Sequence, residues 1–163
     1  MDDPAVEFAA WDTPISGDDL FLIDISFNQG DWWGEIPSRG IRFEVPARYP
    51  EIAQGLQICL VSVEKRALYQ ISARDVEAFR MLGEHGLTEL WQATADQGSR
   101  PAKSTFRVRN HGWSRESFLS FEFALDRYSF MIVTDTECVE IVTHEEPVVS
   151  CLRAVEALPL TAE

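Results

Sequence analysis

The chain has 163 residues, of which 45% are hydrophobic and 25% are charged, and its formal net charge is −13. This composition is that of one ordinary folded domain, and it excludes a disordered chain, a collagen-like repeat and a disulfide scaffold. The negative charge repels phosphate groups, so it argues against binding to nucleic acid or to an anionic membrane surface.

We expect a single globular domain over residues 1–163, because the sequence has no internal repeat, no low-complexity tract and no long linker. It has no apolar run of about 18 residues that would span a bilayer, and its start lacks the basic and apolar regions of a signal peptide. These features predict a cytoplasmic protein. The cysteines Cys59, Cys138 and Cys151 lie among apolar residues, and we expect them to be reduced, buried and unreactive.

The first part of the chain predicts mainly strands. A short helix is expected over residues 4–11. Apolar and polar residues then alternate over 20–27 and over 41–45, which is the period of a strand with one apolar face. Residues 56–63 are apolar on both faces and residues 67–71 follow a short polar turn, so these two segments predict a hairpin.

Two later segments carry the signals of helices. Ser72 can cap a helix over residues 73–84, and the charge of Asp75 favours its positive end. Pro147 suits a first helical turn, and apolar residues then recur at helical spacing. This pattern predicts a C-terminal helix over residues 147–158.

The stretch between these two segments predicts more strands. Residues 87–95 fit either a helix or a strand, and the alternation of Trp91 with alanines favours a strand. Residues 106–109 predict one strand, and residues 118–143 predict a three-stranded antiparallel meander. Together the elements indicate an α+β domain, in which a mostly antiparallel sheet of about six to eight strands packs against two or three helices.

Catalytic and cofactor motifs are absent from the sequence. It has no nucleophile elbow, phosphate loop, dinucleotide-binding glycine motif, H-E-x-x-H or C-x-x-C. Cysteines and histidines can converge in space without a motif, but these cysteines lie where inert buried thiols are usual. The run His144-Glu145-Glu146 is better explained as a solvated turn than as a set of metal ligands. We therefore expect no enzyme activity, no cofactor and no metal.

Acidic residues are concentrated at the N-terminal end, where residues 1–38 contain nine acids and no lysine or arginine. This segment contains the run Asp31-Trp32-Trp33-Gly34-Glu35. Adjacent residues of a strand point to opposite faces, so at least one of the two tryptophans is expected to be exposed. An exposed tryptophan with acidic neighbours is typical of a binding surface, because the ring supplies binding energy and the charges attract a basic partner.

The candidate partner-binding residues are Asp31, Trp32, Trp33 and Glu35, with Asp18 and Asp19 as outer charges. The alternative is that both tryptophans pack and that the acids only keep a loop hydrated. Trp113 is a second candidate for an exposed aromatic residue. Arginines near Trp113 make its patch basic, and their more ordinary role is to pair with the acidic N-terminal segment.

A small acidic domain with aromatic anchors and no catalytic motif is similar in type to bacterial immunity proteins and antitoxins, which inhibit a toxin by covering its active site. No family motif supports this similarity. A basic toxin would be attracted by the same negative field that repels nucleic acid. Two alternatives stay open: a secretion chaperone or adaptor for an effector protein, and a carbohydrate-binding domain or small hydrolase that uses Asp31, Trp32 and Trp33.

Overall fold

The computed structural model of the chain describes residues 4–46, 53–97 and 101–156. Within these residues all pairs of neighbouring strands are antiparallel. The prediction of a mostly antiparallel sheet with few helices is therefore confirmed. The described residues form eleven strands, more than the six to eight expected, and these strands make three sheets instead of one.

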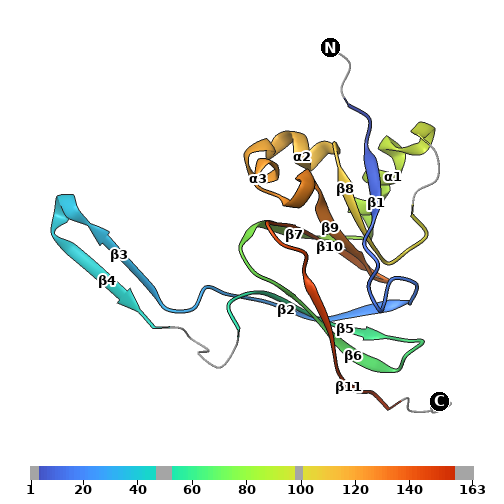
Figure 1. Cartoon of the computed structure of the whole chain (residues 1–163), viewed down its shortest axis with the longest axis horizontal. Helices are drawn as coiled ribbons and strands as arrows, with labels where there is room; N and C mark the ends of the chain where they lie inside the picture. The colour runs from blue at the N-terminus through green and yellow to red at the C-terminus, as the bar shows by residue number, and fades with distance from the viewer. Residues whose placement is uncertain (1–3, 47–52, 98–100, 157–163) are drawn as a thin grey trace.

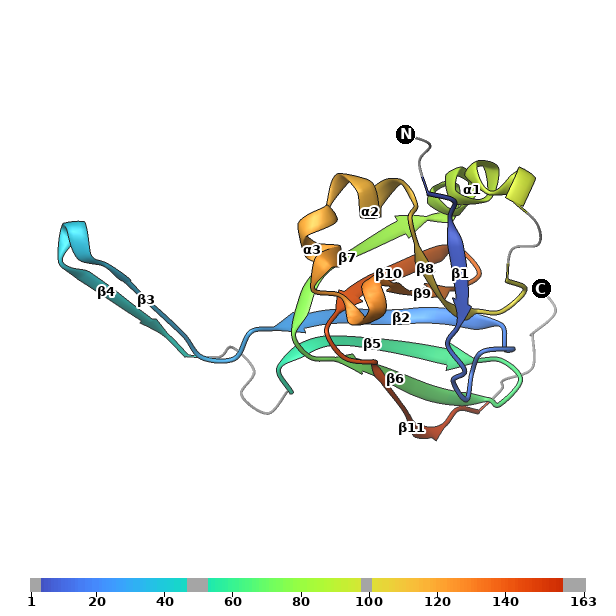
Figure 2. The ribbon, with the colours of Figure 1, turned by 45° about the horizontal axis from the view of Figure 1, so that its top comes forward.

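Two of the sheets form the body of the molecule (Figure 2). The first sheet has the order β1 (Glu7–Ala10), β8 (Thr105–Arg109), β9 (Ser129–Val133), β10 (Glu137–Thr143) and β7 (Val76–Gly83). The second sheet has the order β11 (Val148–Ala154), β6 (Ala67–Ala73), β5 (Gly55–Ser62) and β2 (Leu20–Asn28). Apolar residues of both sheets form one buried core, including Leu56, Ile58, Leu60, Ile71, Phe130, Ile132, Val139 and Ile141. Burial of these side chains on facing sheets is the main stabilising contribution to the body.

Short helices accompany the first sheet. Helix α1 (Glu84–Ala93) packs Leu87 and Leu90 with residues of β8 and β9, and α3 (Phe118–Glu122) follows α2 (Gly112–Glu116) and packs Phe121 on β10. Three single 3-10 turns complete the described elements: η1 (Pro37–Arg39), η2 (Ala95–Gln97) and η3 (Leu125–Arg127). Among the described residues, every helix is too short or too polar to cross a membrane.

The third sheet is a hairpin of β3 (Trp32–Ile36) and β4 (Ile41–Val45), which projects away from the body as an arm (Figures 1 and 2). It pairs with neither of the other two sheets. The strands predicted at 20–27, 41–45, 56–63, 67–71 and 106–109 are confirmed as β2, β4, β5, β6 and β8.

The helix predicted over 73–84 is wrong, because these residues turn sharply and form β7. Asp75 has a φ of 44° in this turn, and the Ser72 hydroxyl donates to the Gln57 side chain instead of capping a helix. The side chain of Arg80 breaks the strand pattern of this segment. It points to the same face of β7 as its partially buried neighbours Ala78 and Leu82 and pairs with a buried carboxylate, so the apolar alternation of the strand is broken by a charged residue.

The C-terminal helix predicted over 147–158 is also wrong where the structure describes it, because residues 148–154 form β11. This strand pairs with β6 and is exposed along most of its length, so its sequence has no alternation of buried and exposed residues. Val148 and Val149 are β-branched, which favours a strand over a helix.

Three further predictions are corrected. Residues 7–10 of the expected N-terminal helix form β1, and the segment 87–95 lies mostly in helix α1 instead of a strand. The first strand of the meander is replaced by α3, although β9 and β10 form its other two strands as predicted. The alternation of Leu119, Phe121 and Phe123 suggested a strand, but only Phe121 is buried.

A buried charge lies on the outer face of the first sheet. Glu140 is fully buried, and Arg80 donates to one of its oxygens at 2.7 and 2.8 Å. Its other oxygen accepts from the Ser129 hydroxyl at 2.5 Å and lies 2.7 Å from Nε2 of the buried His111. Burial alone raises the pKa of the Glu140 carboxyl, but its contacts with His111, Arg80 and Ser129 outweigh this effect, and the pKa lies below its ordinary value.

Glu140→Gln is expected to lower the free energy of unfolding by about 3 kcal/mol at pH 7, because Arg80 loses its buried counter-charge. Since the folded pKa is lowered, the contribution of Glu140 is present above its ordinary value of 4.5 and is lost as the pH falls below it. Urea unfolding at pH 7 and pH 4 should show a smaller difference for the variant than for the wild type. The exposed Glu116→Gln is the control, and an equal loss for both variants would contradict the assignment.

Gly55→Ala is expected to lower the free energy of unfolding by about 2 kcal/mol or more. Gly55 has a φ of 99°, and a Cβ atom there would lie 2.1 Å from the backbone oxygen of Ala73. Gly40 at the tip of the arm also has a positive φ, of 61°, but it has open space around it. Gly40→Ala should therefore leave unfolding of the body unchanged in urea, and similar losses for both variants would refute this explanation.

Candidate protein-interaction site

The arm begins and ends at one place on the body. Asn28 and Gly55 are register partners at the end of the β2–β5 pair, and the chain leaves the sheet between them. Two features bend it outward: Gly30 has a φ of 74°, and the Asn28 side-chain oxygen accepts from the Gly30 N–H at 3.0 Å. The body thus fixes where the arm starts, while the described arm residues extend into solvent (Figure 1).

One face of the arm is apolar. The register pairs Ile36 with Ile41, Gly34 with Phe43 and Trp32 with Val45, so these strand positions share a face. The apolar residues of this face with described side chains, Ile36, Ile41, Phe43 and Val45, are 37%, 41%, 48% and 53% exposed. We call these four residues the apolar arm face.

The opposite face of the arm is charged. Glu35 is the register partner of Arg42, and Trp33 is the register partner of Glu44. The Arg42 guanidinium lies 2.7 Å from the Glu44 carboxylate and 3.9 Å from that of Glu35. All three side chains are more than half exposed, so these ion pairs stabilise the hairpin only slightly. We call this side the charged arm face.

Acidic residues surround the root of the arm. A cleft of about 530 Å³ is lined by Asp75 together with residues 27–29 and 53–55 of the root. A second cleft of about 370 Å³ shares Ala53 and Gln54 with the first and is also lined by Glu145 and Glu146. We call Asp75, Glu145 and Glu146 the acidic collar; Arg74 lines both clefts and offsets one of the three charges.

Four of the predicted partner-binding residues come together on the arm. Asp31 and Glu35 are exposed, at the start and on the charged face of the arm. The structure describes the backbone of Trp32 and Trp33, and their side chains lie outside the described part of the chain. Their register places these two strand positions on opposite faces.

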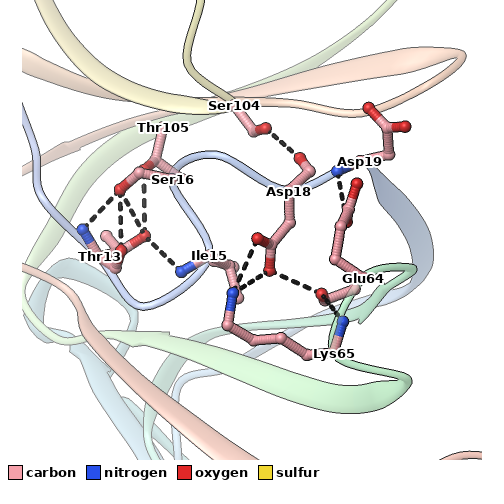
Figure 3. A network of polar contacts seen from close by, with 10 residues as sticks. Thr13, Ile15, Ser16, Asp18, Asp19, Glu64, Lys65, Ser104 and Thr105 are labelled. Carbon is pink, nitrogen blue, oxygen red and sulfur yellow. Dashed lines mark hydrogen bonds and ion pairs between the residues drawn. The ribbon is translucent and has the colours of Figure 1, made fainter.

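Asp18 lies elsewhere and has a structural role. It is 7% exposed, and its carboxylate accepts from Lys65 Nζ at 2.6 and 2.7 Å and from the Ser62 hydroxyl at 2.6 Å (Figure 3). Burial alone raises the pKa of this carboxyl, but the hydrogen bonds from Lys65 and Ser62 outweigh it and lower the pKa. Asp18 thus fixes the loop before β2 to the β5–β6 hairpin.

Asp19 is exposed, and its backbone N–H donates to the Glu64 side chain at 2.9 Å. Asp18 and Asp19 precede the first residue of β2, whereas the arm follows its last residue. The nine residues of β2 separate the two places by roughly 25 Å. The structure therefore does not bring the two outer charges close to the arm.

Trp113, the second aromatic candidate, is only partly exposed. The Arg80 guanidinium lies 4.5 Å from the centre of its ring, and the Phe121 ring packs against it at 5.6 Å. Of the arginines near Trp113 in the sequence, Arg109 pairs as expected with the acidic N-terminal segment, 2.5 Å from Glu7, whereas Arg107 pairs with Asp126 at 3.3 Å. Trp113 is thus mainly a packing residue.

The apolar arm face and the acidic collar were not predicted from the sequence. The alternation of Ile41, Phe43 and Val45 correctly indicated a strand, but a strand pattern does not show whether another layer covers its apolar face. The collar joins residues that are far apart in the sequence, at 75 and at 145–146. The adjacent residues Glu145 and Glu146 were the only sign of the collar in the sequence, and they did not indicate that Asp75 lies nearby.

The comparisons with known proteins give no relative: no protein-family model, no curated protein and no solved structure matches the chain. Among the described residues, no three histidine, cysteine, aspartate or glutamate side chains are grouped as metal ligands. The arm and the acidic collar therefore have to be interpreted from their own chemistry.

The cysteines differ in exposure, and the expectation that all three are buried is wrong. All three are free thiols; Cys138 is buried, Cys59 is half-buried and Cys151 is exposed. Cys151 is exposed because it lies on the edge strand β11 instead of on the buried side of a helix. Burial, with a smaller contribution from the Glu140 charge, raises the pKa of the Cys138 thiol to about 11, and burial also raises the pKa of Cys59.

A thiol reagent is expected to label Cys151 first and Cys138 last in the native protein, because the reacting species is an accessible thiolate. Peptide mass spectrometry at successive times at pH 8 gives this order. Cys151→Ser should remove the fast phase and leave the other two rates unchanged. Labelling of Cys138 as fast as Cys151 would show that the first sheet opens readily.

Proposed function

We propose that this protein is a protein-binding domain that neutralises a basic partner, as an immunity protein or antitoxin does, by placing its arm against the partner's active site. The partner would be a basic toxin or effector enzyme, and the proposed location is the cytoplasm of the cell that makes both. The chain itself would supply no catalytic group. The proposal rests mainly on one observation, the projection of a hairpin with exposed side chains from a closed body (Figures 1 and 2).

The shape of the arm supports this proposal. A projecting hairpin can reach into a concave surface, and active sites are usually concave. The body needs no contribution from the arm to bury its core, because the core consists of residues of the two other sheets and of the loop before β2. Stability of the body therefore does not explain why the arm projects from it.

The charges support a basic partner. The acidic collar lies at the root of the arm, where a protein that covers the arm would also meet it. Asp31 and the charged arm face add three acids, of which Glu35 and Glu44 share one arginine. An enzyme that binds an anionic substrate has a positive cleft, and the same field attracts an acidic inhibitor.

A secretion chaperone or adaptor is the second candidate. Such a protein needs an exposed apolar surface for its client, and helix α3 with the residue after it provides one. Phe118, Leu119 and Phe123 are each about 60% exposed. A chaperone would bind an unfolded client through this patch, whereas an inhibitor would bind a folded enzyme through the arm.

The test compares matched variants on a partner isolated from native cells with the immobilised full chain. Glu145→Gln combined with Glu146→Gln should slow association and flatten its dependence on salt, because charges at the rim act mainly on the association rate. Trp33→Ala should speed dissociation, as loss of an aromatic anchor costs about 2 kcal/mol or more. Surface plasmon resonance at several salt concentrations measures both rates.

The matched control is Asp19→Asn combined with Asp135→Asn. Both residues are exposed and lie near the start of β2, since the Asp135 N–H donates to the Leu20 carbonyl. The roughly 25 Å to the arm exceeds the Debye length of about 8 Å at physiological salt, so this control should leave association nearly unchanged. Equal slowing by both pairs would place the interface elsewhere, and an enzyme partner that stays fully active when saturated would exclude inhibition.

A further inference from the structure

We infer that the apolar arm face is covered by the same face of a second copy of this chain, so that the protein forms a dimer through its arms. The inference concerns the face opposite to the charged arm face and does not rest on the proposed function. It follows from the stability of hairpins, from the shape of the face, from its charge and from its area.

The arm lacks a layer to pack against. An isolated two-stranded hairpin is marginally stable in water, and a third strand or a packed layer is normally required. Within the described residues, β3 and β4 pair only with each other, and all side chains of β4 are exposed. A second sheet packed on the apolar arm face would supply the missing layer.

The shape of the face is self-complementary. Phe43 is the largest side chain among the four, and its register partner is Gly34, which has no side chain. The face therefore places its largest described side chain beside a strand position that has no side chain. In a two-fold dimer each contact occurs twice, so Phe43 of each copy can lie over the Gly34 position of the other.

The charge of the arm permits contact between like copies. Residues 30–46 contain three acids and two arginines, a net charge of −1, whereas the whole chain carries −13. The apolar arm face itself has no charged residue, because Glu35, Arg42 and Glu44 occupy the other face. A second copy thus meets a face without charged side chains, and the projecting arms keep the two acidic bodies apart.

The area of the face predicts a weak dimer. Each strand of the arm has five residues, so the face is roughly 17 Å long. Two such faces bury less than the roughly 1,200 Å² at which stable protein interfaces begin. We therefore expect a reversible dimer with a micromolar dissociation constant, strengthened by salt because salt screens the repulsion between the bodies.

The experiment is sedimentation velocity of the full chain over about 1–100 μM, which spans micromolar affinity. The wild type should pass from monomer to dimer over this range. Phe43→Asp places a charge in the middle of both faces, and its dissociation constant should rise at least about 30-fold. Glu44→Gln, the neighbouring residue on the charged arm face, is the matched control and should keep the dimer.

Each outcome decides the inference. Replacement of residues 31–45 by a flexible linker should give a monomer whose urea unfolding matches the wild type, which separates loss of the dimer from loss of the fold. A wild type that stays monomeric at all concentrations would overturn the inference, as would a dimer that survives Phe43→Asp. The protein could stay monomeric while the acidic-collar variants still change the binding rates for a basic partner. That result would overturn the dimer and support the proposed function.

Discussion

A two-stranded sheet that packs against no other layer cannot bury its apolar face. This constraint distinguishes the arm from the body of the molecule. In the body, the two larger sheets bury their apolar faces against each other. The arm has the same alternation of apolar and polar residues, but nothing within the described chain covers its apolar side. We propose that this exposed apolar surface on a projecting element is where the chain meets another molecule.

The body is built so that it does not depend on the arm. The Asp18 carboxylate, held by Lys65 and Ser62, fixes the start of β2, and the pairing of Asn28 with Gly55 fixes its end. Between these points β2 is hydrogen-bonded to β5 along its length. The conformation of the arm can therefore change on binding without loss of the core, which is the behaviour expected of a binding element on a rigid scaffold.

The sequence predicted most of the strands whose environment matches their pattern. Segments with one or two buried faces were recognised as β5, β6 and β9. Alternation also identified β2 and β4, although Phe21, Ile23 and Phe27 of the predicted apolar face of β2 are 43–59% exposed and all of β4 is exposed. Prediction failed where a charged residue points inward, as Arg80 does in β7 to reach Glu140, and where a strand is exposed on both sides, as in β11. These two failures have one cause. Prediction from hydrophobic periodicity assumes that apolar residues are buried and charged residues are exposed. This assumption does not hold for a buried ion pair or for an apolar edge strand that is exposed.

The candidate site was predictable to the extent that its residues are adjacent in the sequence. Trp32 to Glu35 lie in one strand of the arm and Asp31 directly precedes it, so these residues stay together. Asp18 seemed equally acidic in the sequence, but Lys65, which pairs with it, is 47 residues away and neutralises its charge. The acidic collar and the projection of the arm depend on which strands pair in space, and local patterns carry no such information.

The central claim, that the arm is ordered by contact with another molecule, is tested most directly by hydrogen exchange of the full chain at two protein concentrations. At a concentration well below the micromolar range, amides of β3 and β4 should exchange almost as fast as those of an unfolded peptide, while amides of β5 and β10 stay protected. Protection of the arm should then rise with protein concentration, or on addition of a basic partner. Arm amides that are as protected as those of β5 in the dilute protein, with no change on concentration or binding, would contradict the account.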